Sequence, residues 1–182
     1  LEDKKYTLEN RVNLQGGTWT INGNTVYDAE KHGLGEVTVK VAFEESSNVG
    51  MAKLAYSSYA KTPSQYINHL KRLGFDSLTG IDLYGERAPL MYKPGNKYWS
   101  ATTLPWMAFG YNIAITPMHT AMLYNAVANN GIMMRPYLLN AVQKGGIVIR
   151  EKQPFVAREK ICSDETLKQL KECLEGVCTD GT

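Results

Sequence analysis

The amino-acid sequence predicts a mainly helical α+β fold. Segments that begin with a helix-capping residue and carry apolar residues three or four apart recur along the chain. Only two short segments have the pattern of strands, and each is a hairpin closed by a turn that contains glycine. With 182 residues, 43% hydrophobic and 21% charged, the chain is long enough for one domain with a core.

The first half of the chain is predicted to contain a hairpin and then two helices. The hairpin covers residues 17–28, with an Asn-Gly pair as its type I′ turn. Thr38 is a suitable N-cap for a helix that ends near Glu45. The next helix is expected at residues 49–60, with Asn48 as its N-cap because Asn is among the preferred capping residues.

A third helix is predicted to start at Thr62. Thr62 is the expected N-cap, Pro63 the first helical residue and Gln65 the partner in a capping box. Gly74 is a suitable residue to end the helix. Residues 75–100 are rich in Gly, Pro and Tyr, which indicates a long ordered loop. The apolar stripe of this helix consists of Tyr66, Ile67, Leu70 and Leu73.

The second half is predicted to contain two more helices and a second hairpin. Thr116 and Pro117 start a helix that runs to about Asn129. The hairpin covers residues 138–150 around a Gly-Gly turn. Ser163 begins the last helix. Its apolar face consists of Leu167, Leu170, Leu174 and Val177, with Gly176 near its end. The total is four or five helices and two hairpins.

Ser46 and Asn48 form a Ser-x-Asn triplet in the break between two predicted helices. Residues two apart in a helix point about 200° apart, whereas in an extended or turn segment they face the same side. The break therefore allows both side chains to serve one pocket. The alternative is that Ser46, Ser47 and Asn48 only cap the second helix, since Ser and Asn are common N-caps.

Composition and charge argue against several classes of function. A net charge of +2 predicts no strong attraction to nucleic acid or to a membrane surface. No apolar run approaches the ~20 residues that a membrane helix needs. His32, His69 and His119 lie far apart, which favours packing or surface roles over a metal site. We therefore expect no metal and no cofactor.

Two further pairs of residues have open roles. Phe109 and Tyr111 flank a glycine, and they form either an aromatic wall of a cleft or part of the core. Glu44 and Glu45 precede the triplet, and a solvated helix face is favoured over a general base.

The stretch from Phe43 to Lys53 closely resembles the class B penicillin-binding proteins, the monofunctional transpeptidases of bacterial cell-wall synthesis. The likeness continues in order and spacing along most of the chain. It includes Gly17-Thr18-Trp19, Leu73-Gly74-Phe75, Gly85-Glu86-Arg87, Phe109-Gly110-Tyr111, Thr116-Pro117-Met118, Asn129-Asn130-Gly131 and Arg135-Pro136. One departure is Asn112, where the family usually has Gly. Another is Met118-His119, which replaces the commoner Leu-Gln.

The resemblance implies that residues 1–182 are a partial transpeptidase domain. They would form the helical subdomain of the penicillin-binding-protein and β-lactamase-like fold with small hairpins, most of the central sheet being absent. The family's Ser-x-x-Lys nucleophile motif is expected before Leu1 and its Lys-Thr-Gly motif after Thr182. Ser58 and Lys61 match Ser-x-x-Lys, but they follow Ser46 instead of preceding it. Ser58 is also expected at the end of a helix, where the dipole does not favour an oxyanion.

The resemblance also implies the chemistry of the parent protein. A serine would attack the D-Ala-D-Ala end of a peptidoglycan stem peptide, and β-lactams would acylate the same serine. Ser46 would relay protons, while Asn48 would bind the substrate's amide and help to place the lysine. The parent would be anchored in the bacterial cytoplasmic membrane, with this domain on the outer, periplasmic side among other cell-wall synthesis proteins. No nucleic-acid partner and no transmembrane segment are expected in this stretch. The alternative is a β-lactam sensor or a scaffold module of the same fold.

Overall fold

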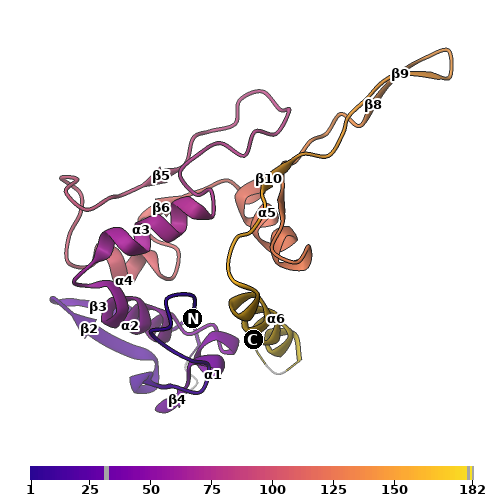
Figure 1. Ribbon diagram of the computed structural model, residues 1–182. Helices are drawn as coiled ribbons and strands as arrows, with labels where there is room; N and C mark the ends of the chain where they lie inside the picture. The colour runs from indigo at the N-terminus through magenta and orange to yellow at the C-terminus, as the bar shows by residue number, and fades with distance from the viewer. Residues whose placement is uncertain (31–32, 180, 182) are drawn as a thin grey trace.

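The computed structural model describes residues 1–30, 33–179 and 181, and it combines helices with small antiparallel pairs of strands (Figure 1). Helix makes up 36% and strand 18%, so the fold is a mixture with helix in twofold excess, less dominated by helix than the sequence predicts. The helices are α1 Val39–Glu44, α2 Asn48–Tyr59, α3 Pro63–Arg72, α4 Thr103–Met107, α5 Pro117–Ala128 and α6 Asp164–Thr179, with a 3₁₀ turn at Gln15–Gly17.

Every sheet within the described residues has two strands. The two predicted hairpins are confirmed as β2 Thr18–Ile21 with β3 Asn24–Tyr27, and β8 Ala141–Lys144 with β9 Ile147–Glu151. The other pairs are β1 Arg11–Asn13 with β4 Glu36–Thr38, β5 Leu90–Met91 with β6 Ile113–Ala114, and β7 Met133–Met134 with β10 Val156–Arg158. These three pairs join distant segments, so local patterns in the sequence did not indicate them.

Several predicted helix ends are confirmed. The Thr38 side chain accepts a hydrogen bond from the Val41 amide, and Gly74 follows α3 with a positive φ of 85°. Thr116 forms a capping box with His119 at the start of α5.

Other details of the predicted helices are wrong. Thr62 makes no side-chain bond to the backbone of α3, because its hydroxyl points to the Gln65 side chain instead. In contrast, Gly176 lies near the end of the last helix as predicted, since α6 ends at Thr179, and the missing Cβ of Gly176 leaves room for the Glu44 side chain of α1. α4 lies in a segment for which no helix was predicted.

Small apolar clusters hold the helices around the segment that contains Ser46. One cluster joins Val12, Leu14 and Ala42, and a second joins Val26, Val49 and Ala52. Gly50 lets α1 and α2 approach closely, since a Cβ there would lie 3.0 Å from the Ala42 Cβ and 3.1 Å from Leu14. The result is a rigid support on both sides of the α1–α2 junction.

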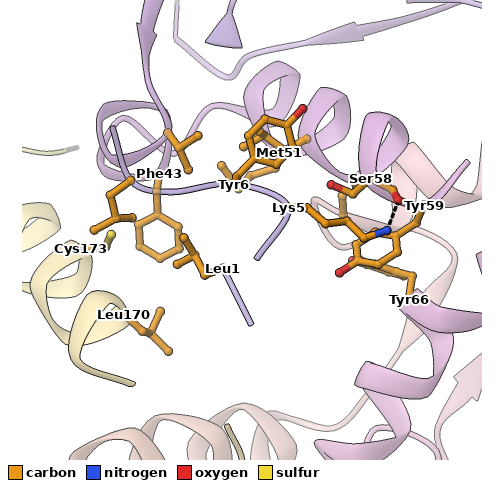
Figure 2. Close-up of a pocket in the computed structure, with 15 residues that line it drawn as sticks. Leu1, Lys5, Tyr6, Phe43, Met51, Ser58, Tyr59, Tyr66, Leu170 and Cys173 are labelled. Carbon is orange, nitrogen blue, oxygen red and sulfur yellow. Dashed lines mark hydrogen bonds between the residues drawn. The ribbon is translucent and has the colours of Figure 1, made fainter. Parts of the chain in front are cut away.

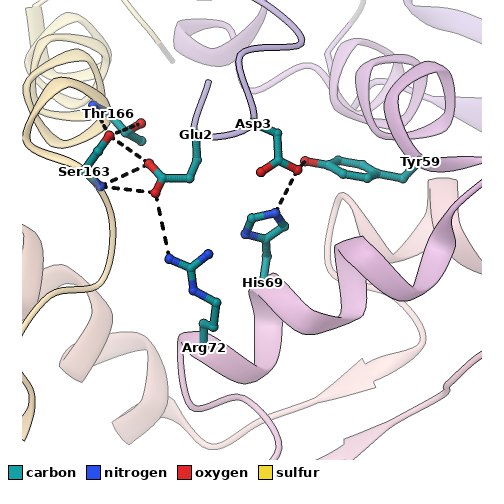
Figure 3. Close-up of polar contacts among 7 residues, drawn as sticks. All are labelled: Glu2, Asp3, Tyr59, His69, Arg72, Ser163 and Thr166. Atoms are coloured by element: carbon teal, nitrogen blue, oxygen red, sulfur yellow. Dashed lines mark hydrogen bonds and ion pairs between the residues drawn. The ribbon is translucent and has the colours of Figure 1, made fainter.

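The N-terminal segment ties three helices together (Figure 3). Glu2 accepts hydrogen bonds from the Ser163 amide and hydroxyl at the start of α6, and it lies 3.9 Å from Arg72 at the end of α3. Asp3 accepts a hydrogen bond from the Tyr59 hydroxyl and contacts His69 Nε2 at 2.9 Å.

Candidate active site

The turn between α1 and α2 exposes Ser46 in a strained backbone conformation. The Ser46 amide donates to the Phe43 carbonyl and the Ser47 amide to the Ala42 carbonyl, which is the Schellman pattern of a helix end. Ser46 occupies the left-handed position of that pattern with a φ of 50°, where glycine is the usual residue. A left-handed conformation costs an L-residue about 1–2 kcal/mol. A serine in this backbone conformation is locally strained, and such strain is found at functional sites.

Ser47 anchors this turn from inside. It is fully buried and is the N-cap of α2, with its Oγ accepting from the Gly50 amide at 2.9 Å. The same hydroxyl donates to Asp28 Oδ2 at 2.9 Å. The prediction that Asn48 caps α2 is therefore wrong, and the capping role falls to Ser47. Because Ser47 caps the helix, the side chains of Ser46 and Asn48 take no part in the cap.

Asn48 is half-buried and its side chain is oriented by the first hairpin. Its Nδ2 donates to the Tyr27 carbonyl at 2.9 Å. This bond leaves Oδ1 as an acceptor and the second Nδ2 hydrogen as a donor. The side chain thus keeps one acceptor and one donor that its bond to Tyr27 does not use.

Phe109 and Tyr111 take two different positions. Phe109 packs with Trp19 and Trp106 against the cluster that contains Val49, the residue directly after Asn48. Tyr111 is 63% exposed, and its ring meets that of Phe109 edge to face at 5.4 Å between centroids. Phe109 therefore belongs to the core beneath the turn, whereas Tyr111 remains available as a surface aromatic residue.

Glu44, His69 and His119 make structural contacts. Glu44 lies between Lys40 of α1 and Gly176 of α6, and this position supports a packing role over a general base. His119 is buried, contacting Thr116 Oγ1 at 2.8 Å and the Ser77 carbonyl at 2.9 Å. His69 contacts Asp3, and His32 lies outside the described residues. In the described part of the chain, no group of three or more His, Cys, Asp or Glu side chains could hold a metal ion.

An apolar cavity of about 260 Å³ is lined in part by residues of α1 and α2 (Figure 2). Phe43, Met51 and Cys173 contribute to its walls, and burial raises the pKa of the Cys173 thiol, so that the thiol stays protonated. Ser58 lies at its edge in the last turn of α2, where Lys5 Nζ donates to the Ser58 carbonyl. Lys61 lies beyond the helix end and is exposed. In the described part of the chain, the bond from Lys5 goes to the Ser58 carbonyl, and no hydrogen bond joins the Ser58 hydroxyl to a base of the kind that a nucleophile needs.

The arrangement defines a class of site: a Ser-x-Asn turn between two helices, braced by a hairpin, with an exposed aromatic residue nearby. Residues 1–182 match the family model described as penicillin binding protein transpeptidase domain. The chain belongs to this family, and the resemblance to class B penicillin-binding proteins is confirmed.

Individual relatives agree with that assignment. The chain is 31% identical to the penicillin-binding protein PbpB of Mycobacterium tuberculosis, over 88% of this chain and 23% of the relative. It is 28% identical to the peptidoglycan D,D-transpeptidase FtsI of Escherichia coli, over 90% of this chain and 25% of the relative. The chain thus spans about a quarter of the length of the curated relatives it matches.

Solved structures show the same fold. Penicillin-binding protein 3 of Mycobacterium tuberculosis, in complex with aztreonam, matches with a TM-score of 0.78 and 27% identity, over 97% of this chain and 38% of that one. Its complex with ampicillin matches with a TM-score of 0.79. Within the described residues, each helix is too short or too polar to traverse a lipid bilayer.

Proposed function

We propose that this chain is the part of a peptidoglycan D,D-transpeptidase that supplies the Ser-x-Asn element of the active site. The observation that carries the proposal is Ser46, an exposed serine in a left-handed position that favours glycine, next to a second serine that already caps the helix. The matched family and the similarity to the peptidoglycan D,D-transpeptidase of Escherichia coli support the choice of reaction.

In the proposed reaction, a serine outside this chain attacks the carbonyl carbon of the penultimate D-Ala of a stem peptide. The bond to the terminal D-Ala nitrogen breaks, and that nitrogen takes a proton as the acyl-enzyme forms. An amine of a second stem peptide then attacks the ester, so that a new amide forms and the serine recovers its proton. A β-lactam enters the first step, and its ring amide bond breaks in the same way.

Within this scheme, Ser46 relays the proton between the catalytic lysine and the leaving nitrogen. Asn48 accepts from the lysine with Oδ1 and donates to the substrate carbonyl with its second Nδ2 hydrogen. Tyr111 forms one wall of the substrate cleft, supported from below by Phe109. Crystal structures of the related mycobacterial protein with aztreonam and ampicillin support β-lactams as ligands. By the same analogy the parent is anchored in the cytoplasmic membrane, with this domain on its periplasmic side among the cell-wall synthesis proteins.

The test is the rate of acylation by a fluorescent penicillin in the full-length protein, compared between wild type, Ser46→Ala and Ser46→Gly. General acid–base groups typically contribute about 10²–10⁴-fold, so both variants should be slower by a factor in that range. Ser46→Gly separates chemistry from folding, because glycine relieves the left-handed strain and should melt no lower than wild type. Acylation of Ser46→Gly at the wild-type rate would show that Ser46 has no part in the chemistry.

A further inference from the structure

We infer that Asp28 is a positioning residue for the Ser46–Asn48 turn, acting through Ser47; the inference rests on the function proposed above. Asp28 directly follows β3, at the end of the first hairpin. Its carboxylate binds the turn on both sides of Asn48: Oδ2 accepts from the Ser47 hydroxyl at 2.9 Å, and Oδ1 accepts from the Val49 amide at 2.8 Å.

Because Ser47 is buried, its hydroxyl group depends on the Asp28 carboxylate as a hydrogen-bond acceptor. Ser47 is fully shielded from solvent, and its oxygen already accepts from the Gly50 amide. The hydroxyl proton therefore needs an acceptor from the protein, and Asp28 supplies it. Leaving a buried donor without an acceptor costs much more than a typical hydrogen bond contributes. The position of Ser47, and with it the backbone of Ser46 and Asn48 on either side, depends on where this carboxylate lies.

The hairpin in turn fixes Asp28. The Asp28 amide donates to the Gly17 carbonyl at 2.9 Å, and a Cβ on Gly17 would approach the Asp28 Cβ to 3.3 Å. The preceding residue, Tyr27, provides the carbonyl that orients the Asn48 amide. Two adjacent residues at the end of β3 thus determine both the backbone of the turn and the direction of the Asn48 side chain. Catalytic groups tolerate little misplacement, since a shift of about 1 Å can cost about 10²-fold in rate.

Asp28→Asn is the informative substitution, because it keeps the shape of the side chain and the acceptor for Val49. The amide NH₂ that replaces Oδ2 cannot accept the Ser47 proton. In the full-length protein, the limiting rate of acylation by a fluorescent penicillin should fall about 10-fold or more, while the penicillin concentration at half-saturation changes less. Asp82→Asn is the matched control, because Asp82 likewise accepts from two backbone amides, those of Leu138 and Leu139, in a different part of the chain. It should leave the acylation rate unchanged.

A double-mutant cycle tests the route through Ser47. Ser47→Ala should lower the limiting rate to a similar degree, and adding Asp28→Asn to it should change the rate little further. Melting temperatures of all variants identify any loss that comes from unfolding. A wild-type limiting rate in a folded Asp28→Asn variant, or additive losses in the cycle, would overturn the inference. Normal acylation of Ser46→Gly would instead overturn the proposed function, whatever the Asp28 variants show.

Discussion

Single residues in left-handed backbone conformations mark both the candidate site and the main departure from the family pattern. Asn112 stands where the family usually has glycine, and its φ of 58° is the conformation that glycine adopts most readily. Asn enters this region more easily than other non-glycine residues, because its short polar side chain can bond locally. Asn112 thus gives the backbone beside Tyr111 a left-handed residue without a glycine.

We predict that Asn112→Gly is neutral or slightly stabilising, whereas Asn112→Val lowers the free energy of unfolding by about 1–2 kcal/mol. A β-branched side chain is poorly accommodated at positive φ. Urea denaturation of the three proteins measures the difference. Equal stability of the valine and glycine variants would show that the backbone at this position is free to change.

Some features of the Ser46-Ser47-Asn48 triplet were predictable from the sequence, and others were not. The break between helices was predictable from capping residues and periodicity, and Ser46 lies in that break, but Asn48 is the first residue of α2 and not part of the break. The identity of the cap was not predictable, since Ser47 and Asn48 are both good N-caps and only tertiary burial selects Ser47. Asp28 carries no signal in the sequence, because its role depends on the hairpin folding back onto α2.

Among the elements, the β8–β9 hairpin differs from the rest of the fold. Figure 1 shows it extending away from the helices, and all five residues of β9 are exposed. Its pattern of strand residues around Gly145 and Gly146 made it predictable, because the two strands pair with each other across a short turn. The pairs β1–β4, β5–β6 and β7–β10 were missed for the opposite reason, since each joins segments that only the tertiary fold brings together.

Brief digestion with trypsin should cut this hairpin first, at Lys144 or Arg150. Local opening needs little free energy where few apolar contacts are made. Lys53 in α2 is the internal comparison, because it donates to the Asn13 carbonyl at 2.6 Å beside a buried cluster. Mass spectrometry of the early fragments identifies the order of cleavage. Cleavage after Lys53 at the same rate would mean that the hairpin is no less stable than the helices.

The N-terminal segment is the second element with a measurable contribution. Burial raises the pKa of Glu2, but hydrogen bonds from Thr166 and Ser163 together with Arg72 outweigh it and hold that pKa below its ordinary value. Burial raises the pKa of Asp3 as well, but the contacts with His69, Tyr59 and Lys5 outweigh burial. The pKa of Asp3 is therefore also below its ordinary value. Both groups bind their proton less readily in the folded state than in the unfolded one.

A lowered carboxyl pKa stabilises the fold above the ordinary pKa, and this contribution is lost as the pH falls through the folded value. The double variant Glu2→Gln, Asp3→Asn should therefore be less stable than wild type at pH 7. The difference should shrink from about pH 4.5 downwards as the wild-type carboxyls take up protons. Urea denaturation across this pH range measures the difference in the free energy of unfolding between the two proteins. A difference that is the same at pH 7 and pH 3 would assign the loss to packing and not to charge.

For the molecule as a whole, the small size of the described sheets is consistent with a chain that forms one part of a larger domain. Each described sheet has two strands, while the matched domains extend well beyond this chain. We propose that the strands of their main sheet, and the serine and lysine of the nucleophile motif, come from other parts of the parent protein. On this proposal, the chain supplies the proton relay and the substrate amide contact, and the group that a β-lactam acylates lies outside it.

The most direct test of this account is to locate the covalent penicillin adduct by mass spectrometry. The full-length protein and the isolated chain of residues 1–182 are each incubated with a fluorescent penicillin, digested and mapped. We predict one adduct in the full-length protein, on a serine outside residues 1–182, and none on the isolated chain, because a reactive serine needs an activating base within hydrogen-bond reach. An adduct on Ser46 or Ser58 in either sample would contradict it.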